Sequence, residues 1–253
     1  MNIIKPNLVV ALLLLLSPVL VSAQSLTPLQ QKVQNVMGMD HRSDAELARD
    51  ADRDPIAALD FIGLEDDMTV VEFLPARQAY YTKILGPVLR DNGHLMVVDN
   101  AGTFASWGGW TEMDKFAMTH QVVIDNNYNR AEGRYVPGEI DFGVNSADMF
   151  LNFREYHNFS EADNNRINAK VFDTLKSGGS YVVIDHTRRH MQEETGVLRR
   201  REDPINVILQ VQKAGLVLDR VSDMFFQLSD DLTQEVGQIP NMTDRFFLVF
   251  KKP

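Results

Sequence analysis

Met68–Leu74 reads MTVVEFL, an apolar and β-branched run with the length of one buried strand. A helical pattern covers Gln78–Leu85, and after the Asp91–Gly93 turn a second apolar run, HLMVVD, covers His94–Asp99. A strand, a helix and a strand in this order are typical of one unit of a parallel sheet. We therefore expect an α/β fold around this unit.

The same alternation continues toward the end of the chain. We predict further strands and helices from apolar runs and from the Pro and Gly residues that bound them. The further strands are 121–125, 148–153, 180–185, 216–221 and 246–250, and the further helices are 160–176 and 203–215. No repeat or linker interrupts the pattern, so residues 63–253 are predicted to be one three-layer α/β domain with a mainly parallel sheet.

Residues 24–62, which precede this domain, carry helix signals. A short helix is expected within 24–39. Ser43–Glu46 fits a capping box that opens a second helix, and Asp54-Pro55 supplies an N-cap and a first-turn proline for a third. We expect this helical segment to pack on the domain.

The first residues have the features of a secretory signal peptide. Lys5 precedes an uncharged apolar run, Leu8–Leu16, and small residues then lead to Ala23. A helix of that length is too short to cross a hydrocarbon core of about 30 Å. We predict that residues 1–23 are cleaved and that the protein is periplasmic or secreted, without a later membrane span. An uncleaved anchor is the alternative.

Composition excludes several classes of function. Asp and Glu number 35 against 25 Lys and Arg, giving a net charge of −10, which repels a nucleic-acid backbone. The chain has no cysteine, and this excludes disulfides, thiolate nucleophiles and cysteine-ligated metal centres. A small-molecule ligand is the expected partner, and the sequence sets no oligomeric state.

The position of a ligand site follows from the predicted sheet. In an open parallel sheet, ligands bind beyond the carboxyl ends of the strands, near the point where strand order reverses. The segments that follow the predicted strands are 72–79, 99–100, 125–126, 152–157 and 185–189. Acidic residues stand at four of these strand ends, so we expect a polar crevice there.

Short motifs spread over His41–Lys252 resemble one family. They are His41-Arg42-Ser43, Ala48-Arg49-Asp50, Val70-Val71-Glu72, Pro75, Tyr81–Leu85, Asn152-Phe153-Arg154, His157-Asn158, Gly178-Gly179, Val183–His186 and Asp244-Arg245-Phe246. In this order the chain resembles the class I S-adenosylmethionine-dependent methyltransferases, and more narrowly the exported bacterial predicted methyltransferases.

The resemblance implies a fold, a cofactor and a set of site residues. The fold is a Rossmann-like sandwich with a seven-stranded, mainly parallel sheet and an antiparallel C-terminal strand. The cofactor is S-adenosylmethionine, whose methyl group passes to a small molecule. Its binding residues are Glu72, Pro75, Ala76 and Gln78 around the first loop, Asp99 for the ribose, Asp125 or Asn126 near the adenine, and Asn152.

The chain departs from the family pattern in the loop after the first strand. Leu74, Ala76 and Gln78 stand where the family has glycines, and Arg77 lies between them. A side chain there fills space beside a cofactor, and a positive φ strains any residue but glycine by an energy on the order of 1 kcal/mol. A catalytically silent binding protein that has lost the cofactor is therefore the alternative function.

Two residues after the fourth strand are candidates for catalysis. The imidazole of His157 has an ordinary pKa of about 6.5, which suits a general base. A structural role for His157 in its loop is weighed equally. If the protein is a methyltransferase, Arg154 is expected to orient the site. The alternative is a structural role, in which Arg154 pairs with the carboxylate of Glu72 or Asp148.

Three other clusters favour structural interpretations. His186 and His190 with Asp185 have a metal-ligand spacing, but the adjacent arginines make a polar loop the better prediction, so no metal is expected. The Trp107–Trp110 patch is predicted to be a core edge rather than a lid over an apolar substrate. Arg199–Arg201 is predicted to be a solvated helix start rather than an anion site.

Overall fold

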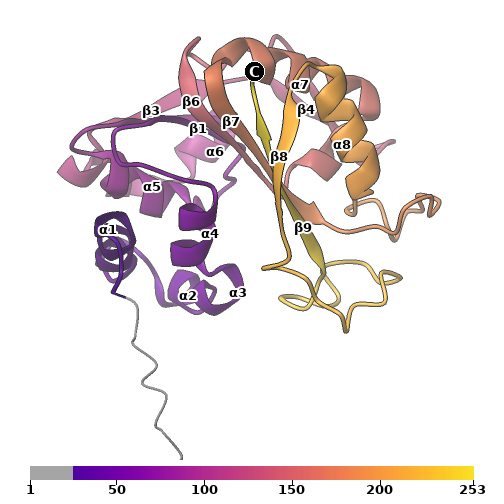
Figure 1. Ribbon diagram of the computed structural model, residues 1–253, viewed down its shortest axis with the longest axis horizontal. Helices are drawn as coiled ribbons and strands as arrows, with labels where there is room; N and C mark the ends of the chain where they lie inside the picture. Colours follow the sequence, from indigo (N-terminus) through magenta and orange to yellow (C-terminus); the bar gives the residue numbers. More distant parts are fainter. Residues whose placement is uncertain (1–24) are drawn as a thin grey trace, which may run out of the picture.

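The computed structural model describes residues 25–253, so the predicted signal peptide lies outside the described residues. These residues form a three-layer α/β sandwich around one seven-stranded sheet (Figure 1). The strands of the sheet are β1 (Thr69–Phe73), β2 (His94–Asp99), β3 (Thr119–Val123), β6 (Ala147–Phe153), β7 (Leu175–His186), β8 (Val217–Ser222) and β9 (Arg245–Lys251). All seven predicted strands are thus confirmed, with shifts of a few residues at their ends.

The strand order is β3-β2-β1-β6-β7-β9-β8. β3, β2, β1, β6 and β7 pair in parallel, whereas β9 is antiparallel to both β7 and β8. The predicted Rossmann-like fold with an antiparallel C-terminal strand is confirmed. The order reverses between β1 and β6, and a crevice beyond the carboxyl ends of these two strands is the place where such sheets bind ligands.

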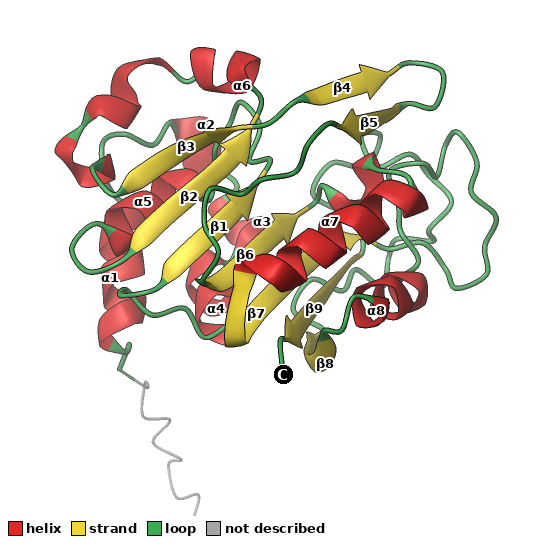
Figure 2. Cartoon of the chain, turned by 90° about the horizontal axis from the view of Figure 1, so that it is seen from above, coloured by secondary structure: helices red, strands yellow, loops and turns green. Residues whose placement is uncertain are grey.

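Helices cover both faces of the sheet (Figure 2). They are α1 (Pro28–Met37), α2 (Asp44–Leu47), α3 (Asp50–Arg53), α4 (Pro55–Phe61), α5 (Thr82–Leu89), α6 (Ala101–Ala105), α7 (Glu161–Thr174) and α8 (Pro204–Lys213), with 3₁₀ turns at Gly108–Glu112, Asp114–Phe116 and Tyr156–Asn158. Consecutive strand residues point to opposite faces. Val70 accordingly packs in the core beneath α1, α4 and α5, and Val71 packs in the core beneath α7 and α8.

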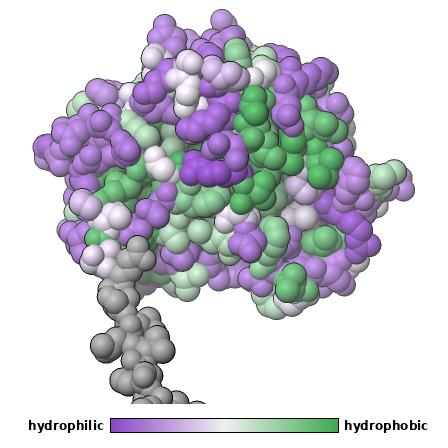
Figure 3. Space-filling model, in the orientation of Figure 1, coloured by the Kyte–Doolittle hydropathy of each residue, from purple (hydrophilic) through white to green (hydrophobic). Residues whose placement is uncertain are grey.

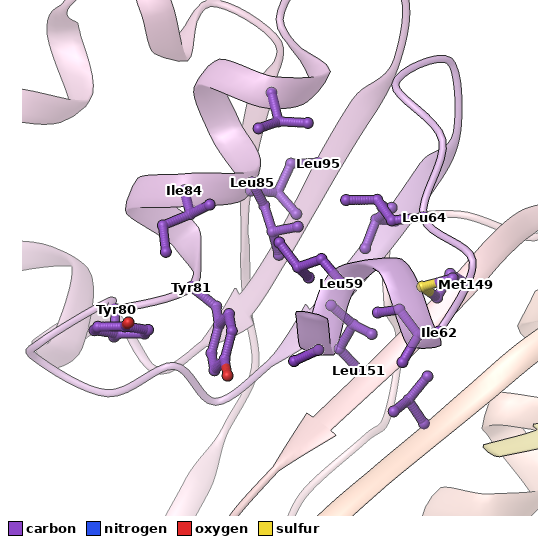
Figure 4. Packing of buried hydrophobic residues seen from close by; sticks show 14 of the residues in the cluster. Leu59, Ile62, Leu64, Tyr80, Tyr81, Ile84, Leu85, Leu95, Met149 and Leu151 are labelled. Atoms are coloured by element: carbon purple, nitrogen blue, oxygen red, sulfur yellow. The ribbon is translucent and has the colours of Figure 1, made fainter. Parts of the chain in front are cut away.

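The N-terminal helices share the first of these cores. Figure 4 shows Leu59 and Ile62 of the α4 segment against Met149 and Leu151 of β6. Both capping predictions hold: Ser43 and Glu46 form the capping box, and the Asp54 side chain accepts from the Ala57 N–H. The helical segment therefore builds on the sheet through buried apolar side chains.

The segment predicted as a helix over 78–85 is shifted in the structure. α5 begins at Thr82 and continues through Pro87 to Leu89. A proline has no N–H to donate to the residue four positions earlier, which here is Lys83. Nε2 of His41 lies 2.7 Å from the free Lys83 carbonyl oxygen, so His41 satisfies the group that Pro87 leaves open.

Local sequence signals did not predict the small hairpin formed by β4 (Asn126–Asn129) and β5 (Arg134–Pro137). α7 also ends earlier than predicted, because Leu175 already pairs with Ala147 as the first residue of β7.

At the β8 edge of the sheet, hydrophobic side chains gather over α8 and β8 (Figure 3). Val217 and Val221 of β8 are exposed there, with charged Asp219 between them on the same face of the strand.

Candidate active site

A cavity of about 310 Å³ lies beyond the carboxyl ends of β1, β6 and β7, at the reversal of strand order. Its walls come from the loop after β1, the segment after β6, the end of β7, the start of β9, and two arginines around α3. Of the predicted site residues, the cavity brings together Glu72, Pro75, Ala76, Gln78, Arg154 and His157. Residues distant in the sequence thus meet where the topology predicts a site.

The loop after β1 is bent by residues in the left-handed conformation. Leu74, Ala76 and Ala79 have φ values of +52°, +60° and +47°, whereas Gln78 is not among the residues with positive φ. The strain expected for a positive φ at Gln78 is thus absent, and Leu74, Ala76 and Ala79 carry the left-handed conformation instead. Arg77 and Gln78 are both exposed; Gln78 lines the cavity and Arg77 does not.

Glu72 is the buried carboxyl group of this loop. It is 4% exposed, and its Oε2 accepts a hydrogen bond from the Thr82 hydroxyl at 2.7 Å. Burial, with a contribution from the nearby Asp99 charge, raises the pKa of Glu72 to about 7. Glu72 therefore changes its charge near neutral pH.

Asp99 and Trp107 close the neighbouring part of the crevice over β2. The Asp99 carboxylate accepts from the Ala76 N–H at 3.2 Å and from the Asn100 N–H at 2.7 Å, and burial raises the pKa of Asp99. Nε1 of Trp107 donates to the Ala76 carbonyl oxygen at 3.0 Å. Trp107 is 4% exposed, which confirms the core-edge prediction for this residue.

Three predicted cofactor residues do not line the cavity: Asp99, Asp125 and Asn152. Asp125 is exposed just before the β4–β5 hairpin, because β3 ends two residues earlier than predicted. Asn152 is fully buried in β6, where its amide donates to the Tyr181 hydroxyl at 3.3 Å. The structure therefore places the three outside the open part of the crevice.

His157 is paired with Asp185, a partner that sequence analysis considered only as a metal ligand. Nδ1 of His157 lies 2.8 Å from Oδ1 of Asp185, and the His157 backbone N–H donates to Oδ2 at 2.9 Å. Asp185 is fully buried, so its carboxylate holds the proton on Nδ1 and leaves Nε2 as an acceptor. His157 lines the cavity. This pair has the chemistry of an oriented general base.

Arg154 has neither of its two predicted structural partners. Asp148 accepts from the Thr69 N–H at 2.8 Å and pairs with Lys176, and Glu72 is bound by Thr82. Arg154 instead donates from Nε to Nε2 of His186 at 3.2 Å. It adopts a left-handed φ of +68°, an unusual conformation that aims the chain at the end of β6 back toward β7.

The two histidines after β7 bind different partners, and the arginine run that follows them is partly buried. Nδ1 of His190 lies 2.9 Å from Oδ2 of Asp203, whereas His186 contacts Arg154. Among residues 25–253, no group of three potential ligands could hold a metal ion. Arg201 is not solvated as expected, because it is fully buried against Asp230.

Four other arginines of the cavity were not among the predicted site residues: Arg49, Arg53, Arg200 and Arg245. Arg49 and Arg53 are four residues apart around α3, and Arg245 begins β9. The only local signal was the spacing of the first two. Their convergence depends on contacts between opposite ends of the chain.

No family model and no curated protein matches the sequence. Solved structures do match the fold: a SAM-dependent methyltransferase from Aquifex aeolicus has 16% identity, with 88% of this chain and 98% of that chain covered and a TM-score of 0.56. The [4+2]-cyclase SpnF has 12% identity, coverage of 89% and 93%, and a TM-score of 0.59.

Human N-acetylserotonin methyltransferase, solved in complex with SAM, has 10% identity and a TM-score of 0.53. The match covers 88% of this chain but 56% of the human enzyme, so this chain spans little more than half of that relative. Identities this low show the fold alone. Residues 25–253 thus have the Rossmann-like fold of S-adenosylmethionine-dependent methyltransferases.

Proposed function

We propose that this protein is an S-adenosylmethionine-dependent methyltransferase that acts on a small molecule in the cell envelope. The observation that carries the proposal is the His157–Asp185 pair, which faces a cavity beside the β1 loop. The envelope location rests on the predicted signal peptide. Because SpnF shares the fold and is a cyclase, the fold by itself does not set the reaction.

The residues of the β1 loop fit a cofactor of this kind. The left-handed turns at Leu74 and Ala76 place this stretch of backbone in the cavity wall, and Glu72 adds a carboxyl group there. Asp99 has lone pairs for a hydroxyl beside the Ala76 N–H that it already accepts from. It is 3% exposed and does not line the cavity, so the segment that covers it must move before a cofactor reaches it. Leu74, Ala76 and Glu72 would hold the cofactor, and Asp99 would join them.

When bound, S-adenosylmethionine supplies an electrophilic methyl group. In the proposed reaction, Nε2 of His157 takes a proton from the acceptor, and this raises the nucleophilicity of the acceptor atom. Asp185 is a positioning residue, because it orients His157 and stabilises the imidazolium that forms. Holding the two reactants in one cavity lowers the entropic part of the barrier.

The alternative of a silent binding protein predicts that loop side chains occupy the cofactor space. Arg77 does not line the cavity, and although Leu74 and Gln78 do, a volume of about 310 Å³ remains beside them. We therefore favour the enzyme over the silent protein.

Calorimetric titration of the purified protein with S-adenosylmethionine and with S-adenosylhomocysteine tests the cofactor. We expect both to bind with Kd values below 1 mM. Absence of heat with either ligand at millimolar concentration overturns the methyltransferase proposal. Asp185→Asn serves as the matched variant and should keep S-adenosylhomocysteine binding within about twofold, because Asp185 does not line the cavity.

The envelope location has its own test. Intact-mass measurement of the protein from producing cells should give a chain that begins at Gln24. A chain that begins at Met1 contradicts cleavage and supports the anchored alternative.

A further inference from the structure

The cavity contains arginines that are not neutralised by the protein. Elsewhere, buried arginines pair with carboxylates: Arg42 with Asp50 at 2.5 Å, and Arg201 with Asp230 at 2.9 Å. Four arginines of the cavity have no such ion pair with any residue of 25–253. They are Arg49, Arg53, Arg154 and Arg245. In a chain of net charge −10 carboxylates are abundant, so the lack of ion pairs to these four arginines is a local feature.

Aromatic rings hold three of these guanidinium groups in place of carboxylates. The Arg53 guanidinium lies 4.2 Å from the centre of the Tyr80 ring, and that of Arg49 lies 5.9 Å from the same ring. The Arg245 guanidinium lies 4.7 Å from the Phe225 ring. A contact of this kind attracts a guanidinium to the ring face without using its N–H donors.

The remaining hydrogen bonds use few of the available donors. Arg245 donates from Nη2 to the Asp52 carbonyl oxygen at 3.1 Å, while its buried Nε has no partner. Arg154 donates from Nε to His186 at 3.2 Å. The N–H groups of a guanidinium match the two oxygens of a carboxylate or phosphate, so the cluster is suited to an oxyanion.

The cluster is costly to the fold when nothing neutralises it. Burial and the neighbouring charges of Arg49 and Arg154 lower the pKa of Arg53 to about 10, so the group stays charged at neutral pH. The two carboxyl groups of the cavity, Glu72 and Glu155, have pKa values raised to about 7 and about 8 by burial. The cavity therefore keeps a positive charge near pH 7.

We infer that the acceptor is an oxyanion, a small molecule with a carboxylate or phosphate group that these four arginines bind. The inference rests on the proposed function, because His157 lines the same cavity and would act on that acceptor. Tyr80, Tyr81, Phe153 and Phe225 also line the cavity, so the rest of the acceptor is apolar or aromatic.

The test uses benzoate and phenyl phosphate as probes and benzamide as the neutral probe of matched size. Each is titrated into protein saturated with S-adenosylhomocysteine, whose own carboxylate would otherwise be a second source of an oxyanion. We expect the two anions to bind at least tenfold more tightly than benzamide. The tighter of the two, benzoate or phenyl phosphate, shows whether the site prefers a carboxylate or a phosphate group.

Arg53→Met is the informative variant because the Arg53 side chain donates no hydrogen bond within residues 25–253, so its loss breaks none. We expect it to weaken anion binding at least tenfold and to leave the melting temperature of the free protein equal or higher, since an uncompensated charge is removed. Arg90→Met is the matched control, because Arg90 pairs with Asp114 outside the cavity, and should leave the affinities unchanged.

Three results overturn the inference. One is equal affinity for benzamide and benzoate, and another is an Arg53→Met variant that binds benzoate within twofold of the wild type. The third is competition between benzoate and S-adenosylhomocysteine, which would assign the arginines to the cofactor carboxylate. Failure of S-adenosylhomocysteine to bind at all is a separate result, and it overturns the proposed function itself.

Discussion

The crevice at the end of the sheet has two unlike halves. Over β1, β6 and β7 it is open and lined by arginines and His157. Over β2 it is closed, because Asp99 binds the Ala76 N–H and Trp107 binds the Ala76 carbonyl oxygen. The open half carries charges that the protein leaves unneutralised, whereas the closed half has satisfied its polar groups internally.

This difference indicates which half is ready for a ligand. The open half gains energy when an oxyanion enters, since no protein carboxylate is paired with its four arginines. In the closed half, Asp99 and Trp107 are both buried, so binding there is coupled to movement of the β1 loop that they hold at Ala76. The loop is thus the element that connects acceptor and cofactor binding.

The largest expected effect comes from breaking the support of the open half. Arg201 and Asp230 are both fully buried, and their ion pair joins the segment containing Arg200 to the loop containing Phe225. Arg201→Met leaves the Asp230 charge buried without its partner. We expect the free energy of unfolding, measured with urea, to fall by about 3–5 kcal/mol.

Arg90→Met provides the control for that change. Arg90 and Asp114 are exposed on the surface, where an ion pair contributes at most about 1 kcal/mol. If the free energy of unfolding falls no more for Arg201→Met than for Arg90→Met, the Arg201–Asp230 pair does not support the segments that carry Arg200 and Phe225.

A somewhat smaller loss is expected at the base of the open half. The Asp185 carboxylate accepts from the backbone N–H groups of His157 and His186 and from Nδ1 of His157. Asp185→Ala leaves these buried donors without an acceptor, and we expect a loss of about 2–3 kcal/mol in urea unfolding. Asp185→Asn keeps one acceptor oxygen and should lose less.

Nitrogen NMR of His157 separates positioning from general stability. The wild type should carry its proton on Nδ1, and this preference should disappear in Asp185→Ala. An unchanged tautomer would show that Asp185 does not orient the imidazole.

Glu72 stands between the two halves and gives the structure a pH dependence. Its folded pKa of about 7 lies above the ordinary 4.5, so the folded state retains a proton that the unfolded state releases. Stability is therefore lost as pH rises from about 4.5 to about 7. Between pH 6 and 7 the contribution is about 1 kcal/mol.

Glu72→Gln should remove that part of the slope, because glutamine is neutral and its amide oxygen still accepts from Thr82. Urea unfolding at pH 6 and 7 measures the difference between variant and wild type. Glu132→Gln, at an exposed position, is the control and should leave the slope unchanged. Equal slopes for Glu72→Gln and wild type would contradict the raised pKa.

The sheet was predictable because its signals are local. Apolar runs such as Val70–Phe73 and Val97–Val98 are buried on both faces, and each marks a strand without reference to the rest of the chain. The position of the cavity followed from the same topology. His157 was a candidate for that reason, since it follows the end of β6.

The rest depends on contacts that no local pattern contains. β3 ends before Asp125 because the chain turns into the β4–β5 hairpin. The Asp99 carboxylate accepts a hydrogen bond from the Ala76 N–H, which lies in the loop after β1. Arg49 and Arg245 meet only after folding. In the loop after β1, the third left-handed residue is Ala79 rather than Gln78, and the sequence alone does not fix which residue of a turn takes that conformation.

The smallest expected effect concerns that turn, and its sign differs between two neighbouring positions. Ala76 is exposed with φ +60°, so Ala76→Gly removes strain of about 1–2 kcal/mol and gives back about 0.4–1 kcal/mol through the more flexible unfolded chain. A net gain of about 0.5–1 kcal/mol in urea unfolding is expected.

Leu74 also has a positive φ, +52°, but it is only 4% exposed. Leu74→Gly removes a buried side chain that is worth more than about 2 kcal/mol, so this loss outweighs the relief of strain. If both variants are destabilised equally, strain at Ala76 is not what holds the closed half in its present form. If only Ala76→Gly is stabilised, the left-handed turn at Ala76 carries strain in the free protein, and the buried side chain of Leu74 outweighs the same strain two residues earlier.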